Sequence, residues 1–312
     1  MPFRFGSIDG LLLLLTLFWG SNFSVIKAAL DEFPPLPFNA LRLTLASLIF
    51  LGLLRGSRVS SPSRRDWPGI IALGVVGHLL YQVCFMEGIS RTSAANSSLI
   101  LGATPIAVTV LMWGGGRKAP SVAHWFGIGL SLFGIYLVVG RGAQMGTASW
   151  TGDLLMVAAV WCWAIYTVGA RSMLERYSPL AVTAWSMAVG TALFVPLGLP
   201  GLFVLDWRAI SLGAWVGLVY SAVFALCAAY LIWYTAVQRI GSVRTSVYSN
   251  MVPVVAMIVA ALWLGESISA AQVGGAASIV AGVALTGAWR LTPSAGPKAA
   301  ANDPKAATPP ER

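Results

Sequence analysis

The chain has 312 residues, of which 57% are hydrophobic and only 10% are charged, and its mean hydropathy is +0.77. These proportions leave too few polar residues to cover the surface of a soluble protein, so the composition excludes that class and indicates a protein of the bilayer. The net charge of +9 does not indicate a nucleic-acid partner, because the basic residues lie scattered between hydrophobic runs.

Apolar runs separated by turn residues predict an all-α integral membrane protein with ten spans, since about 20 residues of helix cross a bilayer. The predicted spans are 8–30, 36–54, 67–89, 92–113, 121–139, 152–174, 179–197, 211–237, 242–264 and 268–289. One turn is predicted at Gly114-Gly115-Gly116 and another at Leu199-Pro200-Gly201. The chain has no room for an additional soluble domain.

The chain also repeats itself. An offset of 144 matches Trp19 to Trp163, and an offset of 148 matches Pro105 to Pro253. Each copy holds five predicted spans, and an odd number makes the second copy enter the membrane in the opposite orientation. The sequence therefore predicts two inverted five-helix repeats around a central cavity, which is the architecture of alternating-access carriers. The expected divisions are 1–143, 144–290 and a disordered cytoplasmic tail over 291–312.

The orientation follows from the positions of lysine and arginine, which are enriched in cytoplasmic loops. With a cytoplasmic N-terminus, fifteen basic residues lie on the inner side and five on the outer side. The outer five are Lys27, Arg42, Arg91, Arg141 and Arg208. This difference predicts that both termini are cytoplasmic.

Small residues recur at four-residue spacing in the fifth and tenth spans. These residues are Ala123, Gly127 and Ser131 in the fifth, and Gly274, Ser278 and Gly282 in the tenth. Such stripes allow close helix packing in lipid. We expect them to serve packing, either within one chain or between the protomers of a homo-oligomer; a substrate path along them is the less favoured alternative.

The third span carries the most informative polar cluster. His78, Tyr81, Gln82 and Phe85 follow the spacing i, i+3, i+4 and i+7, so an α-helix would place them on one face. Because buried histidine and glutamine need partners or water, we expect this face to line a polar cavity.

The symmetry mates in the first and sixth spans add aromatic groups to that cavity. We expect Trp19 and Asn22 of one span to face Trp163 and Tyr166 of the other across the pseudo-twofold axis. Asn96, at the start of the fourth span, would either bind a carboxylate or cap its helix.

Pro105 and Pro253 occupy matched positions in the fourth and ninth spans. Each should kink its helix, because proline removes a backbone hydrogen bond. Paired interruptions of this kind point to a central site, so we expect the two prolines to shape or hinge the cavity.

Several absences narrow the chemistry. None of the eleven acidic residues falls in the middle of a span, which makes the chain unsuited to exchanging protons for cationic drugs. No nucleotide-binding lysine motif or zinc-binding helix motif occurs, and the three cysteines show no Cys-x-x-Cys spacing. We therefore expect no cofactor, no metal and no enzymatic reaction.

Four short motifs resemble those of the drug/metabolite transporter superfamily, and specifically its EamA family. They are Phe18-Trp19-Gly20-Ser21-Asn22-Phe23, Asn39-Ala40-Leu41-Arg42, Ala103-Thr104-Pro105 and Gly265-Glu266. The likeness covers residues 8–290 and is greatest to YddG-type amino-acid exporters of bacterial inner membranes. It implies ten helices around a central cavity and efflux of amino acids, aromatic ones among them.

On this interpretation aromatic side chains contact the apolar part of an amino acid, while Asn22, Gln82 and His78 bind its polar ends. Efflux of other amphipathic metabolites or drugs is the alternative within transport. A membrane enzyme or a scaffold is the alternative from another class, although no paired acids or catalytic triad lie in a span. Two modes of coupling are open. Either His78 carries a proton during transport, or it remains a neutral hydrogen-bonded residue and export is facilitated diffusion.

Overall fold

The computed structural model describes residues 6–57, 59, 61–92, 97, 100–116, 119–139, 150–264 and 269–286. The candidate Asn96, the motif Gly265-Glu266 and the predicted tail over 291–312 lie outside these residues. Every regular element in the described part of the chain is a helix. Six helical stretches there are long and apolar enough to cross a membrane, and three shorter apolar helices accompany them.

The elements follow in chain order, with η marking π- or 3-10 helical segments. They are α1 (Ser7–Ala29), α2 (Pro35–Gly56), α3 (Trp67–Gly74), η1 (Val75–Leu80), α4 (Tyr81–Arg91), α6 (Thr104–Gly114), α7 (Val122–Val139), α8 (Trp150–Leu174), α9 (Pro179–Phe203), α10 (Leu212–Tyr220), η2 (Ser221–Ala228), α11 (Ala229–Ile240), α12 (Ser242–Val247), η3 (Tyr248–Met251), α13 (Val252–Leu264) and α14 (Ala270–Leu285).

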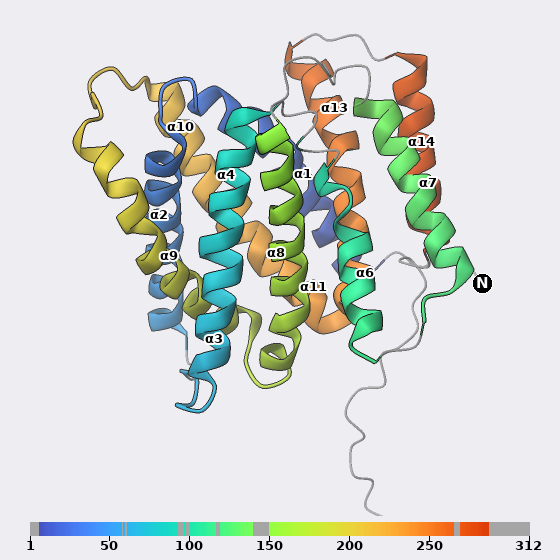
Figure 1. Ribbon diagram of the computed structural model, residues 1–312, viewed down its shortest axis with the longest axis horizontal. Coiled ribbons are helices and arrows are strands. Elements are labelled where there is room, and N and C mark those ends of the chain that lie inside the picture. Colours follow the sequence, from blue (N-terminus) through green and yellow to red (C-terminus); the bar gives the residue numbers. More distant parts are fainter. Residues whose placement is uncertain are drawn as a thin grey trace, which may run out of the picture.

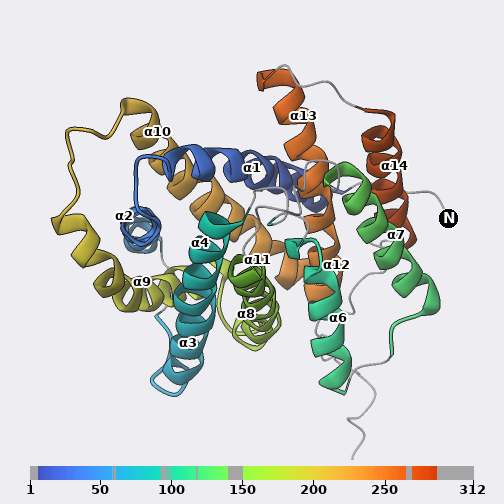
Figure 2. The same ribbon diagram turned by 45° about the horizontal axis from the view of Figure 1, so that its top comes forward.

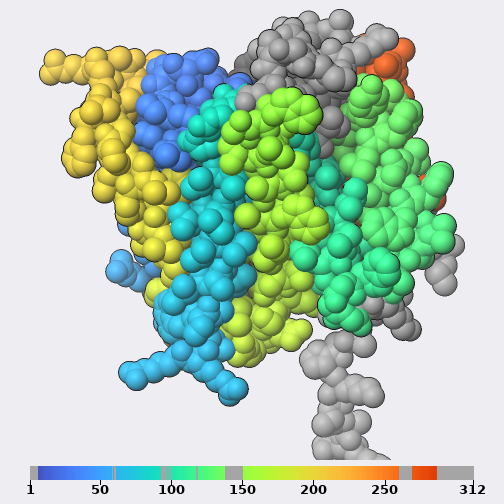
Figure 3. Space-filling view, in the orientation of Figure 1, coloured from blue at the N-terminus to red at the C-terminus, as the bar shows by residue number. Residues whose placement is uncertain are grey.

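The helices form one bundle, in which α8 and α11 stand midway between its left and right sides in the views of Figures 1 and 2. The pair α2 and α9 packs on one side, and the pair α7 and α14 forms the opposite side. In the space-filling view, α4 and α8 lie side by side along one outer face (Figure 3). The outer surface of α8 is apolar: Leu154, Val157, Trp161 and Ile165 are exposed at helical spacing, as a lipid-facing stripe would be.

The turn predicted at Leu199-Pro200-Gly201 is wrong, because α9 continues through Pro196 and Pro200 to Phe203. The reason is local packing against α2. A Cβ atom on Gly201 would lie only 2.4 Å from Pro37 Cγ, so this glycine permits a close approach of the two helices. Membrane helices tolerate proline where neighbouring elements satisfy or shield the freed backbone groups.

Two of the long helices contain a π-helical segment, which the sequence pattern did not predict. Residues 75–80 form η1 and residues 221–228 form η2, both in the middle of a longer helix. A π-turn contains an additional residue relative to an α-turn, so it rotates the side chains on either side of it and frees backbone carbonyl groups. Such segments are frequent at functional sites.

The small-residue stripes bring α7 and α14 together within one chain. A Cβ atom on Gly127 would lie 2.7 Å from the carbonyl oxygen of Gly282, and one on Gly134 would lie 2.5 Å from that of Gly275. Ser131 lies at the same contact, where its hydroxyl donates to the Ile279 carbonyl at 3.4 Å. The predicted packing role is therefore observed for part of each stripe, whereas Gly274 faces open space.

Gly282→Leu should destabilise the protein, because its side chain would collide with Ser131 and with the backbone of Gly127. Overpacking of this kind costs about 1–3 kcal/mol. The measurement is the thermal unfolding midpoint in detergent. Gly274→Leu on the same helix is the matched control, since its Cβ has no neighbour within 4 Å. Equal midpoints for the two variants would contradict the observed packing.

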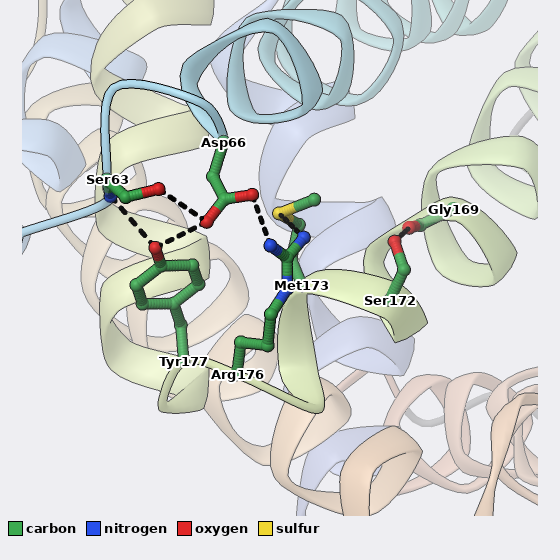
Figure 4. Close-up of polar contacts among 7 residues, drawn as sticks. All are labelled: Ser63, Asp66, Gly169, Ser172, Met173, Arg176 and Tyr177. Carbon is green, nitrogen blue, oxygen red and sulfur yellow. Dashed lines mark hydrogen bonds and ion pairs between the residues drawn. The ribbon is translucent and has the colours of Figure 1, made fainter.

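Where α3 begins, a polar network joins the loop before this helix to the loop between α8 and α9 (Figure 4). The buried Asp66 carboxylate pairs with Arg176 and accepts hydrogen bonds from Tyr177 at 2.6 Å and from Ser63 at 2.8 Å. The backbone N–H of Ser63 donates in turn to the Tyr177 hydroxyl at 2.8 Å. These contacts fix the position at which α3 begins.

The network makes stability depend on pH. Hydrogen bonds from Tyr177 and Ser63, with a further contribution from Arg176, lower the pKa of Asp66 from its ordinary value of 3.8. A lowered pKa in the folded protein contributes stability that is complete above 3.8 and is lost as the pH falls through the folded value. Asp66→Asn should therefore be less stable than the unsubstituted protein at neutral pH. The difference between the thermal unfolding midpoints of the two proteins should shrink as the pH is lowered. A constant difference in midpoint across that range would refute this role for Asp66.

Candidate substrate cavity

A cavity lies between the helices, with walls from α1, α2, α4, α8, η2 and α11 and from the segments that begin α6 and α13. The lining residues are Trp19, Asn22, Phe23, Arg42, Tyr81, Gln82, Phe85, Leu101, Gly102, Thr104, Trp163, Ala225, Leu226, Tyr230, Ser249 and Val252. Most of these side chains are aromatic or aliphatic, and the polar ones are few. Concave sites with this composition bind small amphipathic molecules.

Six of the nine binding residues predicted from the sequence line this cavity. They are Trp19, Asn22, Tyr81, Gln82, Phe85 and Trp163. Two others, His78 and Tyr166, are described but do not line it, and Asn96 lies outside the described residues.

The separation of His78 from its predicted neighbours follows from η1. Helical spacing predicted one face for His78, Tyr81, Gln82 and Phe85, but His78 lies in the π-helical segment and the others follow it in α4. The His78 ring nitrogen Nε2 lies 2.7 Å from the Tyr166 hydroxyl and 3.3 Å from that of Ser186. His78 is thus fully buried in a hydrogen-bonded cluster between η1, α8 and α9.

Aromatic rings form one wall of the cavity around Trp163, which is buried on α8. Its ring centroid lies 5.5 Å from that of Trp19, 5.1 Å from that of Tyr81 and 5.1 Å from that of Tyr230. The indole N–H of Trp19 donates to the Ala225 carbonyl in η2 at 3.0 Å. The π-helical segment therefore supplies the acceptor that orients Trp19.

Arg42 is a charged cavity residue that sequence reasoning missed. The charge count placed it on the outer side of the membrane, but it lies inside α2 and is only 2% exposed. Without it the count becomes fifteen basic residues against four, and the predicted orientation is unchanged. A sufficient signal was present, because Arg42 falls within the predicted span 36–54, and arginine inside a span usually faces a cavity.

Arg42 and Gln82 belong to one hydrogen-bonded chain across the bundle. The guanidinium donates from Nη1 to the Ser221 hydroxyl at 2.9 Å and from Nη2 to Gln82 Oε1 at 2.8 Å. Gln82 Nε2 donates onward to the Tyr230 hydroxyl at 3.2 Å. This chain links α2, α4, η2 and α11 at the cavity wall.

Two buried polar atoms of cavity-lining residues have no hydrogen-bond partner among the described residues. One is Arg42 Nε, a donor, and the other is Asn22 Oδ1, an acceptor. Buried polar atoms are almost always hydrogen-bonded, so such exceptions in a cavity wall are the atoms expected to contact a ligand.

Both predicted prolines stand where a helix is interrupted. Pro105 lies in the first turn of α6, directly after a turn at Gly102 and Ala103. Pro253 is the second residue of α13, directly after the 3-10 segment η3. Gly102 and Val252, which adjoin these breaks, line the cavity.

Comparison with known proteins shows that the sequence is similar to those of transporters. A transporter of Archaeoglobus fulgidus without an assigned substrate is 31% identical over 88% of this chain and 96% of its own length. A probable terminal-alkyne amino-acid exporter of Streptantibioticus cattleyicolor is 28% identical over 88% of this chain and 91% of its own. A solved structure described only as the crystal structure of a protein superposes with a TM-score of 0.72 at 20% identity, over 90% of this chain and 96% of that one, which supports the fold.

The model of the EamA-like transporter family matches residues 6–140 and 150–288, which together include every helix described above. The chain therefore belongs to the EamA-like transporter family.

Proposed function

We propose that this protein exports amino acids, aromatic and other apolar ones included, across a bacterial inner membrane by alternating access. The cavity carries this proposal, because its aromatic wall suits an apolar side chain and its few polar groups suit the ends of a zwitterion. The relative described as a probable terminal-alkyne amino-acid exporter gives independent support for amino acids as the substrate class. The resemblance to YddG-type exporters forms part of the same proposal.

Contacts between matched positions support two inverted five-helix halves. Residues 144 apart meet at Trp19 and Trp163 and again at Ser47 and Thr191, whose hydroxyl oxygens lie 2.7 Å apart. Residues 148 apart meet at Gln82 and Tyr230. Equivalent residues touch only near an axis that relates the two copies. The family model also leaves a gap at 141–149, which contains the predicted division between 143 and 144.

In this proposal the two halves rock about the cavity, and the helix breaks at Pro105 and Pro253 allow the bending. The excess of lysine and arginine on the inner side, fifteen residues against four without Arg42, supports a cytoplasmic position for both termini. The cavity then opens alternately to the cytoplasm and to the outer side, and it releases the amino acid down its concentration gradient.

We further propose that export does not need a proton carried by His78. The imidazole is fully buried, contacts Tyr166 and Ser186, and does not line the cavity. A neutral histidine satisfies these contacts without a charge in the membrane. Transport driven by an imposed pH gradient, and lost in His78→Gln, would overturn this part of the proposal.

Counterflow in proteoliposomes tests the function. Vesicles loaded with unlabelled L-phenylalanine should accumulate external labelled L-phenylalanine transiently and saturably, and other apolar amino acids should compete. Vesicles without protein give the background. If no amino acid in a broad panel exchanges, the proposed function is wrong. Exchange of amphipathic metabolites instead would support the alternative substrate class, and full cellular function in transport-dead variants would support a scaffold.

Association of copies through α7 and α14 is a separate proposal. Within one chain, α7 and α14 pack against each other at Gly127, Gly134, Gly275 and Gly282. Gly274 and the exposed Ser278 lie outside that contact, so they are free to contact a second chain. Oxidative cross-linking of a Gly274→Cys variant in membranes should then yield a dimer, and its absence would argue for a monomer.

A further inference from the structure

We infer that Arg42 is the residue that binds a carboxylate of the transported molecule, so that substrates of this carrier must carry a carboxylate. The inference rests on the proposed transport function and names the substrate class of the same cavity. It starts from the position of Arg42, which lies two turns inside α2 with its side chain on the cavity wall.

The partners of the guanidinium are all neutral. Ser221 and Gln82 each accept one hydrogen bond, and the Phe38 ring lies 5.9 Å from Cζ on the preceding turn. Two ion pairs in the described part of the chain join Arg91 to Glu87 and Arg176 to Asp66, and neither involves Arg42. Among the described residues, the positive charge of Arg42 therefore has no acidic counterpart.

A charge in this position is costly unless an opposite charge joins it. Removing an ion from water costs several kcal/mol even after relaxation, and neutral hydrogen bonds recover only part of that. Charged side chains inside membrane bundles accordingly mark substrate pathways. Arginine suits a carboxylate in particular, because its planar fork of N–H groups binds two oxygens at once.

The unpaired atoms agree with this ligand chemistry. Arg42 Nε is a free donor and Asn22 Oδ1 is a free acceptor, and both residues line the same cavity. A carboxylate would satisfy the donor, and an ammonium group would satisfy the acceptor. An α-amino acid carries both groups on the same carbon, whereas a simple amine would leave Arg42 unpaired.

A purely structural role for Arg42 is the competing explanation, since its hydrogen bonds join α2 to α4 and η2. The two explanations differ over Gln82→Glu. This substitution keeps the size and the acceptor beside Arg42 and adds a negative charge to it. If Arg42 is a structural bridge, this substitution should keep or strengthen the bond between α2 and α4. If Arg42 binds the carboxylate of the substrate, the added negative charge should neutralise the guanidinium and weaken substrate binding.

The first experiment uses the unsubstituted protein and measures inhibition of L-phenylalanine counterflow by three analogues. 3-Phenylpropionate keeps only the carboxylate, 2-phenylethylamine keeps only the amine, and L-phenylalaninamide keeps the amine but blocks the carboxylate. We expect 3-phenylpropionate to inhibit at concentrations about tenfold or more below those of the other two analogues. A difference of this size corresponds to the contribution of one charge-assisted hydrogen bond to binding. Equal inhibition by 2-phenylethylamine and 3-phenylpropionate would overturn the inference.

The second experiment compares Gln82→Glu, Arg42→Gln and Arg42→Lys, each checked for monodispersity in detergent. Gln82→Glu should fold, and it should raise the L-phenylalanine concentration that half-saturates counterflow about tenfold or more. Arg42→Lys should retain more activity than Arg42→Gln, because it keeps the charge but loses the fork. If folded Gln82→Glu transports as the unsubstituted protein does, Arg42 is a structural bridge only.

Failure of the proposed function gives a different result. If no amino acid is exchanged by the unsubstituted protein, a thermal shift with 3-phenylpropionate still tests Arg42. Stabilisation by this acid that disappears in Gln82→Glu would keep the carboxylate site and reject amino-acid export. No stabilisation by the acid and no exchange would reject both.

Discussion

Tyr81→Ala is expected to raise the L-phenylalanine concentration that half-saturates counterflow roughly thirtyfold, which corresponds to a loss of about 2 kcal/mol of binding free energy. Tyr81 lines the cavity, stacks on Phe85 at 5.6 Å and contacts the Trp163 ring at 5.1 Å. Its removal takes away one surface against which an aromatic substrate would pack and loosens the wall behind it.

Tyr136→Ala is the matched control for that variant. Tyr136 lies on α7 with 55% of its surface exposed, away from the cavity, so its loss removes the same group without touching the site. Tyr81→Phe should retain most of the activity, because it keeps the ring. Normal transport by a folded Tyr81→Ala protein would mean that aromatic substrates do not bind at this wall.

Gly190→Leu is expected to leave almost no folded protein. A Cβ atom at this position would lie 2.2 Å from the Cβ of His78 and 2.6 Å from the carbonyl oxygen of Gly74. These neighbours are a Cβ atom and a backbone oxygen, which cannot move aside as the end of a flexible side chain can. The collision would force α9 away from η1, which carries His78. The measurement is the fraction of detergent-extracted protein that elutes as a single species.

Gly52→Leu provides the comparison for Gly190→Leu. Gly52 lies on α2, where an added Cβ meets nothing within 4 Å, so leucine there should be tolerated. Similar yields of monodisperse protein for the two variants would contradict the packing between α9 and η1.

The sequence predicted the helices and the aromatic part of the site well, because both depend on patterns that a single chain displays. Apolar runs located α1, α2, α8 and α14 to within a few residues. The offset of 144 predicted that Trp19 and Trp163 would face each other, and their rings do meet edge to face. Internal similarity here carried information that composition and periodicity do not.

The remaining features depend on departures from regular geometry. The α-helical period placed His78 on the same face as Tyr81 and Gln82, but the π-helical segment η1 changes that period. The residue types in Val75–Leu80 do not predict a π-helix. Likewise α9 continues through Pro200, because the fit of Gly201 against Pro37 depends on tertiary packing. Arg42 was a different case, since its position in a predicted span was visible but its charge was counted on the outer side of the membrane.

The most direct test is the structure of the protein with L-phenylalanine bound at saturating concentration. We predict density in the cavity with the ring against Trp163 and Tyr81, the carboxylate within hydrogen-bonding distance of Arg42, and the ammonium group at Asn22 Oδ1. Bound L-phenylalanine in another place, or in this cavity with its carboxylate turned away from Arg42, would contradict the account.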